Sequence, residues 1–239
     1  MFLTLSTTHA PATDLGYLLE KHPDRIHRRS LPFGEVLAFF PQATEHRCTI
    51  ACFLDIDPIG LVRRSNDANS FALEQYVNDR PYCACSFFSV ALIRMFGSAL
   101  KGKSRERPEL TQQNLPWEVH IPTLPSRGGA ALASRLFAPL GYIVEATQEI
   151  LDPHMPGWGS APYLSLTLKA HCTLQTLLQH LYVLIPVFDD RKHYWVGLDE
   201  VEKLLEKGTG WLEQHPEKHQ ITRRYLKHFA SLTKIALRR

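Results

Sequence analysis

Residues 86–100 constrain the fold more than any other part of the chain, because apolar side chains lie on almost every side of the helix they would form. These side chains include Phe87, Phe88, Leu92, Met95 and Phe96. A helix that is apolar all round is a buried helix. We therefore expect this segment to form a central helix enclosed by the rest of the protein.

Short apolar runs bounded by turn residues predict strands on both sides of this segment. The expected strands are residues 2–6, 34–40, 47–55, 117–124, 142–150 and 163–169. Further helices are expected at residues 13–22, 129–140, 174–184, 199–207 and 220–237. This mixture predicts an α+β fold with mainly antiparallel sheets around the central helix.

The polar segment 102–116 holds two prolines and a cluster of charged residues. Such a composition is typical of a lobe boundary or a mobile loop. We expect two packed lobes, residues 1–112 and 113–239. A chain of 239 residues with 44% hydrophobic residues can fill either one large core or two small ones.

The net charge of +3 is too small to indicate nucleic-acid binding by itself. Five cysteines, an odd number, lack the spacing of a disulfide framework or a zinc site, so we expect reduced thiols in a cytoplasmic protein. The first residues do not resemble a signal peptide, and the longest uncharged apolar run, residues 181–188, is too short to span a bilayer. No membrane partner is expected.

Several segments in a fixed order match one family. They are residues 8–19, 55–63, 71–85, 135–142, 193–197 and 221–227. Over nearly its whole length the chain resembles the amino-terminal half of the bacterial 3′-terminal RNA ribose 2′-O-methyltransferase, the counterpart of the plant Hua-enhancer small-RNA methyltransferase.

The resemblance implies a non-catalytic activator. In that family this half binds the bacterial polynucleotide kinase, phosphatase and ligase protein, here called the kinase/phosphatase/ligase protein, and stimulates its RNA ligase during RNA repair. The methyltransferase domain of the family lies downstream. The resemblance therefore implies a protein partner, with RNA touched only weakly or indirectly.

The chain lacks the residues that methyl transfer requires. A site for S-adenosylmethionine needs a glycine-rich turn after a strand, but Gly157-Trp158-Gly159 and Gly208-Thr209-Gly210 are better explained by turns and a helix end. The metal-binding Glu-x-x-Glu-His pattern of the family has its nearest match at Gln42-Ala43-Thr44-Glu45-His46, without the first carboxylate. We expect no catalytic residue, metal or cofactor, and a chain that stops before the methyltransferase domain.

Paired aspartates suggest a third and least favoured function, that of a phosphatase. Asp55 and Asp57 follow an apolar strand, as in haloacid-dehalogenase phosphatases, where one attacks phosphorus and the other moves a proton. Pro58 and Ile59 depart from that family's pattern, so a turn at the strand end is favoured.

Charged and aromatic loops are the expected contact sites, because interface hot spots favour Arg, Tyr and Trp. Two loops have this character, although ion pairing between lobes explains their charges at least as well. The cluster at residues 101–107 is a third candidate, and a solvated segment is favoured for it. The predicted partner-binding residues are Asn78, Asp79, Arg80, Tyr82, Arg105, Arg107, Asp189, Asp190, Arg191, Lys192, His193 and Trp195.

The last predicted helix is amphipathic and basic. A solvated face leading toward a downstream domain is favoured for its charges over RNA contact. The alternative function is an RNA-binding module that positions broken RNA for a fused methyltransferase, through Arg223, Lys227, Lys234 and Arg238.

Overall fold

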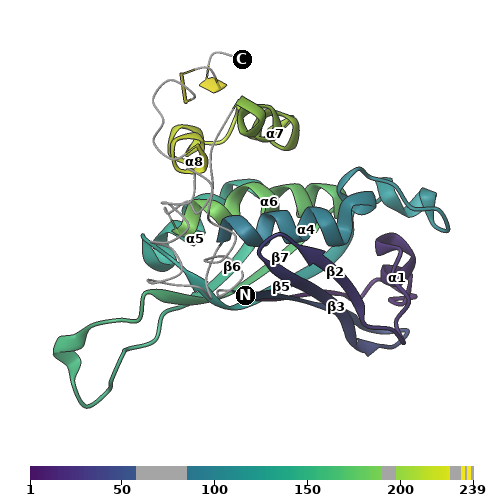
Figure 1. Ribbon diagram of the computed structural model, residues 1–239, viewed down its shortest axis with the longest axis horizontal. Helices are drawn as coiled ribbons and strands as arrows, with labels where there is room; N and C mark the ends of the chain where they lie inside the picture. The colour runs from purple at the N-terminus through teal and green to yellow at the C-terminus, as the bar shows by residue number, and fades with distance from the viewer. Residues whose placement is uncertain (58–84, 190–197, 227–232, 235, 238–239) are drawn as a thin grey trace.

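The computed structural model describes residues 1–57, 85–189, 198–226, 233–234 and 236–237. Its described strands form one antiparallel seven-stranded sheet in the order β2-β3-β4-β1-β5-β7-β6 (Figure 1). The strands are β1 Phe2–Thr7, β2 His27–Leu31, β3 Gly34–Ala43, β4 Cys48–Ile56, β5 Leu115–Pro125, β6 Ile143–Thr147 and β7 Tyr163–Cys172. The predicted α+β class with antiparallel pairing is confirmed.

Helices form two further layers on one side of this sheet (Figure 1). The helices α4 and α6 lie side by side on the sheet, and α7 and α8 contact the outer side of α6. The described helices are α1 Asp14–Leu19, α4 Cys85–Leu100, α5 Gly129–Phe137, α6 Leu174–Asp189, α7 Leu198–Gly208 and α8 Lys218–Tyr225, with short 3-10 turns η1 Pro108–Gln112, η2 Ala138–Leu140 and η3 Pro156–Trp158. None of the helices described is long and apolar enough to cross a membrane.

The core lies between the sheet and α4 with α6. Four apolar residues that face one another on adjacent strands are at most 1% exposed: Leu5, Ile50, Val119 and Leu168. Alternate residues of a strand point to opposite faces, so these four side chains all point toward the helices. In α4, Phe88 is fully buried. The prediction of a buried central helix at residues 86–100 is confirmed.

The opposite face of the sheet is partly exposed, and none of the described helices covers it (Figure 1). Along β5 and β7, buried residues alternate with partly exposed ones such as Glu118 and Lys169. This alternation is the pattern of a sheet with one face in the core and one face available to solvent or to a partner.

The sheet is continuous across the predicted lobe boundary. Strand β1 pairs with β4 and also with β5, which joins residues 1–112 to residues 113–239. Segment 102–116 runs along α1, where the Ser104 hydroxyl donates to the backbone oxygen of Tyr17 at 3.0 Å. The two segments share one sheet, and a division into domains at residue 112 stays a prediction.

Three elements differ most from the sequence prediction. Strand β2 was not predicted, because residues 27–31 are mostly polar and β2 is an edge strand. Helix α6 continues beyond the predicted end at residue 184 and includes Pro186. Helix α8 ends with Leu226 as its C-cap, so a single helix over residues 220–237 was wrong.

The end of α6 is held by groups from outside the helix. The last carbonyl groups of a helix lack partners within it. The Arg224 side chain donates to the backbone oxygen of Val187 at 3.1 Å, and the backbone N–H of Arg127 donates to the backbone oxygen of Phe188 at 2.9 Å. The Arg224 contact also attaches α8 to α6, which shows that one cation of the basic terminal segment has a structural role.

Candidate interaction surfaces

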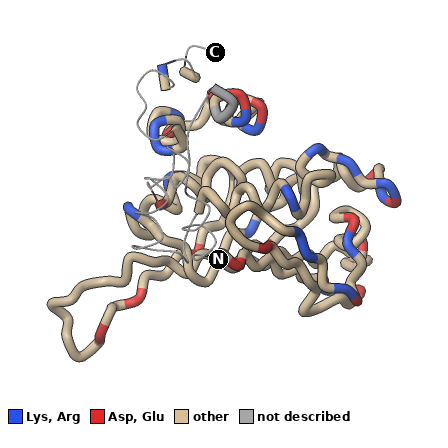
Figure 2. The backbone as a smooth tube through the Cα atoms, viewed as in Figure 1, with Lys and Arg blue, Asp and Glu red and all other residues tan. Residues whose placement is uncertain are grey.

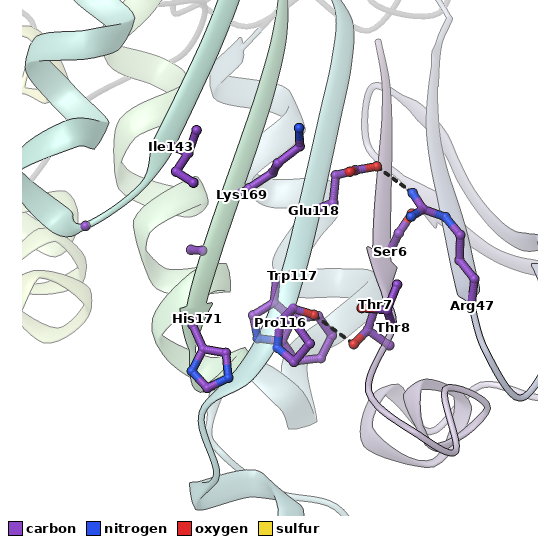
Figure 3. Close-up of a pocket in the computed structure, with 12 residues that line it drawn as sticks. Ser6, Thr7, Thr8, Arg47, Pro116, Trp117, Glu118, Ile143, Lys169 and His171 are labelled. Carbon is purple, nitrogen blue, oxygen red and sulfur yellow. Dashed lines mark hydrogen bonds and ion pairs between the residues drawn. The ribbon is translucent and has the colours of Figure 1, made fainter.

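A row of five side chains, four of them polar, crosses the face of the sheet that no described helix covers. Ile143, Lys169, Glu118, Ser6 and Thr49 lie opposite one another on β6, β7, β5, β1 and β4. Figure 3 shows most of this row at one end of the sheet. All members of the row except Thr49 line a shallow pocket of about 410 Å³, together with Arg47, Pro116 and His171.

The charged groups of this pocket are paired within the protein. The Arg47 guanidinium forms an ion pair with Glu118 (Figure 3). The Lys169 ammonium lies 2.7 Å from the Glu145 carboxylate, and this hydrogen bond raises the pKa of Lys169. Both pairs are at least partly exposed, so they contribute little to stability and remain available for exchange with a partner's charges.

The pocket has no arrangement for covalent chemistry. The Ser6 hydroxyl bonds that of Thr49 at 2.8 Å, and the Thr7 hydroxyl donates to the backbone oxygen of Pro116 at 2.8 Å. A nucleophilic serine would instead be bonded to a base. We interpret the pocket as a polar binding face.

Three cysteines of the described ranges lie in surroundings that suppress thiolate chemistry. Burial raises the pKa of Cys48 to about 11, that of Cys52 to about 12 and that of Cys172 to about 11. A thiol with a pKa this high is protonated at neutral pH, and the thiolate is the reactive form. Cys48 and Cys52 are core residues, and Cys172 is partly buried against the core.

The described residues also offer no metal centre. Within the ranges given above, no three His, Cys, Asp or Glu side chains come close enough to hold an ion. Asp55 is exposed on β4, and the Asp57 N–H donates to the backbone oxygen of Phe33 at 3.0 Å. That bond extends the pairing between β4 and the start of β3, whereas the predicted turn at Asp57-Pro58 runs into residues outside the described ranges and stays a prediction.

A buried polar pair joins helix α6 to the residue before β6. The Tyr142 hydroxyl and Nδ1 of His180 are 2.9 Å apart, and the Trp211 ring meets the His180 ring edge-on. Burial lowers the pKa of His180 to about 4, with a smaller effect from nearby His215. The neutral imidazole is therefore part of the packing between α6 and the segment after α7.

The predicted contact residues Arg105 and Arg107 lie beside α1. The Arg107 guanidinium is 3.1 Å from the Asp14 carboxylate and lies 5.5 Å from the centre of the Tyr17 ring. Arg105 is 3.8 Å from Glu20, and its side chain is 88% exposed. Arg107 therefore anchors segment 102–116, whereas Arg105 projects toward solvent.

Asp189 lies where the sequence did not place it. It was expected on an exposed loop, but it lies in the last turn of α6 and is 5% exposed. The helix runs further than expected because residues 181–188 are all buried against neighbouring helices. A direct contact between Asp189 and a partner is therefore not supported.

The remaining predicted residues fall into two groups. Arg223 on α8 and Lys234 are exposed, as expected for a solvated basic face. The others lie outside the described residues: Asn78, Asp79, Arg80, Tyr82, Asp190, Arg191, Lys192, His193, Trp195, Lys227 and Arg238. Their roles stay predictions.

Sequence reasoning missed one exposed apolar segment. Residues 148–162, here called the β6–β7 arm, connect β6 to β7 and project beyond the sheet (Figure 1). The pattern Gly157-Trp158-Gly159 predicted only a turn. The available signal was a tryptophan and a methionine inside a stretch rich in proline and glycine, where no core strand or helix would use them.

Comparison with known proteins identifies the family. A family model described as "RNA repair, ligase-Pnkp-associating, region of Hen1" matches residues 1–239. The chain belongs to this family. The resemblance to the amino-terminal half of an RNA 2′-O-methyltransferase is thereby confirmed.

Solved structures give the same fold. A chain of the Pnkp1/Rnl/Hen1 RNA repair complex matches with a TM-score of 0.56 and 15% identity, over 98% of this chain and 55% of that chain. A second structure of the Pnkp1/Rnl/Hen1 complex matches with a TM-score of 0.60 and 15% identity, over 98% of this chain and 54% of that one. The chain thus spans about half the length of the solved chains. A search of curated protein sequences gave no match.

Proposed function

We propose that this chain binds the kinase/phosphatase/ligase protein and stimulates its RNA ligase during RNA repair. We also propose that it acts as the non-catalytic half of a longer protein that ends in an RNA 3′-terminal ribose 2′-O-methyltransferase. The observation that carries the proposal is the family match, which spans residues 1–239 and describes a ligase-Pnkp-associating region.

The geometry of the described surface supports a binding role. The pocket on the open face of the sheet holds paired charges and bonded hydroxyls, without a nucleophile next to a base. Burial holds Cys48, Cys52 and Cys172 in the protonated form. These features suit a surface that docks on another protein. A protein interface needs a complementary shape and charges at its rim, whereas a catalytic site needs an activated group.

Stimulation of a ligase requires more than attachment. An activator shifts its partner only if it binds the active conformation more tightly than the inactive one. The contacts must therefore be local and directional. We expect them on rigid, well-defined parts of this chain, where a small change in the partner's shape alters the fit.

Binding is tested by pull-down of the purified kinase/phosphatase/ligase protein with the 239-residue chain, repeated over a range of salt concentrations. A protein interface with an apolar centre should persist as salt rises, whereas RNA contact through lysine and arginine weakens steeply. Absence of a complex at low and high salt would refute the proposal.

The RNA-positioning alternative draws support from the exposed cations Arg223 and Lys234. A salt-sensitive affinity for single-stranded RNA, in the absence of any complex with the ligase protein, would favour it.

A further inference from the structure

The β6–β7 arm is an ordered hairpin that continues beyond the edge of the sheet (Figure 1). Its two sides are joined by backbone hydrogen bonds, from the Ala161 N–H to the oxygen of Glu149 at 2.8 Å and from the Leu151 N–H to the oxygen of Gly159 at 3.0 Å. Ile150 and Ser160 form an isolated bridge between them. The arm is therefore held in one extended conformation.

The tip of the arm is also fixed by local contacts. The Asp152 carboxylate accepts a hydrogen bond from the His154 N–H at 2.8 Å, and the Trp158 N–H donates to the backbone oxygen of Met155 at 2.9 Å. Gly159 has a φ of +77°, a value that favours glycine, and it closes the tip. A segment ordered before binding loses less entropy when it docks.

Large apolar side chains gather on this arm without cover. Trp158 is 62% exposed, Ile150 57%, Leu151 53% and Met155 47%. They are four of the nine large hydrophobic residues that are exposed in the described part of the chain. Clusters of this kind mark sites of interaction, and tryptophan and methionine are enriched at the centres of protein interfaces.

The charge of the arm identifies the kind of partner. Residues 148–162 contain Glu149 and Asp152 but neither lysine nor arginine, and Figure 2 shows acidic positions on this arm with no basic one. Carboxylates repel the phosphates that dominate binding to nucleic acids. The exposed tryptophan is therefore suited to an apolar pocket on a protein, with basic residues around the rim of that pocket. It is not suited to stacking on an RNA base.

We propose that the β6–β7 arm inserts its apolar tip into such a pocket, with lysine or arginine at its rim, on the kinase/phosphatase/ligase protein. This inference rests on the proposed function and deepens it, because it assigns the docking element. Ile143, another exposed apolar residue, is the first residue of β6, the strand that leads into the arm.

The test compares three variants by calorimetric titration against the kinase/phosphatase/ligase protein. Trp158→Ala removes the proposed anchor, and Ile26→Ala removes a side chain of matched exposure, 60%, far from the arm in sequence. Glu149→Lys reverses a charge on the side of the arm. Thermal unfolding of each variant shows that the fold is retained.

We expect Trp158→Ala to weaken binding at least about 30-fold, which corresponds to ~2 kcal/mol. Ile26→Ala should leave the affinity unchanged. Glu149→Lys should weaken binding and reduce its dependence on salt, since the partner's rim is basic.

Other outcomes would overturn the inference. If the wild-type chain binds and Trp158→Ala binds equally well, the arm is not the docking element, although the proposed function stands. If Trp158→Ala instead reduces the affinity for a single-stranded RNA oligonucleotide, the tip of the arm binds RNA. If it abolishes a dimer of this chain, the tip binds a second copy of the chain. If the wild-type chain does not bind the ligase protein, the proposed function itself fails.

Discussion

Acid should destabilise this protein through His180. The side chain lies in α6, is 4% exposed, and meets the Tyr142 hydroxyl through Nδ1 and the Trp211 ring edge-on. Among the described residues, its Nε2 atom has no hydrogen-bond partner. A proton added to the ring would place a charge in this apolar setting, next to His215. Burial therefore lowers the pKa of His180 from 6.5 to about 4.

The size of the effect follows from this difference in pKa. The unfolded chain binds a proton near pH 6.5 and the folded chain only near pH 4, so stability present above pH 6.5 is lost as the pH falls toward 4. The full loss is ~3 kcal/mol at 1.36 kcal/mol per pH unit, and the part lost by pH 5 is about 2 kcal/mol.

Urea denaturation at pH 7 and pH 5 measures this contribution. His180→Asn keeps a polar atom near the position of Nδ1 but cannot titrate, so its loss of stability between the two pH values should be smaller than that of the wild type by about 2 kcal/mol. Tyr142→Phe is the control, because it removes the hydrogen-bond partner and keeps the histidine. Equal pH dependence in the wild type and His180→Asn would refute the reasoning.

Two further predictions concern the core and the segment beside α1. Phe88→Ala should reduce the free energy of unfolding by about 3–5 kcal/mol, because it leaves a cavity beside the fully buried part of α4. Urea denaturation measures this loss, and Phe53→Ala, at a partly exposed position, is the control. A loss in Phe88→Ala no larger than that in Phe53→Ala would contradict the prediction. Arg107→Ala should cost about 1–2 kcal/mol, since it removes the guanidinium that meets Asp14 and Tyr17, while Arg105→Ala should cost almost nothing by the same measurement. Equal losses in the two arginine variants would show that Arg107 is not an anchor.

The parts of the fold that the sequence predicted are those with a strong local pattern. Helix α4 is apolar on nearly every side, which only a buried helix explains. Strands β1, β4, β5 and β7 alternate buried and partly exposed residues, or form apolar runs that end at prolines. In these segments the local pattern and the tertiary environment agree.

The boundaries that the sequence missed depend on tertiary contacts. Pro186 predicts the end of a helix because it lacks an N–H group, yet α6 continues to Asp189, where Arg224 and Arg127 satisfy its free carbonyl groups. Strand β2 is polar because it is an edge strand, and only its pairing with β3 reveals it.

The candidate contact surface was the least predictable feature. Charge and aromatic character drew attention to Arg107, which the structure pairs with Asp14. The β6–β7 arm was missed because proline and glycine indicate a turn whether or not that turn projects from the body of the protein. Exposure of Trp158 depends on the direction in which the hairpin leaves the sheet, which no local pattern specifies.

The central claim is ligase stimulation, and a sealing assay tests it most directly. A nicked RNA duplex and ATP are incubated with the kinase/phosphatase/ligase protein, and the 239-residue chain is added in increasing amounts. The account predicts that adenylation of the ligase and sealing both rise, and that they reach a plateau when the two proteins are equimolar. Sealing that stays at its basal rate, at chain concentrations where a complex has formed, would contradict it.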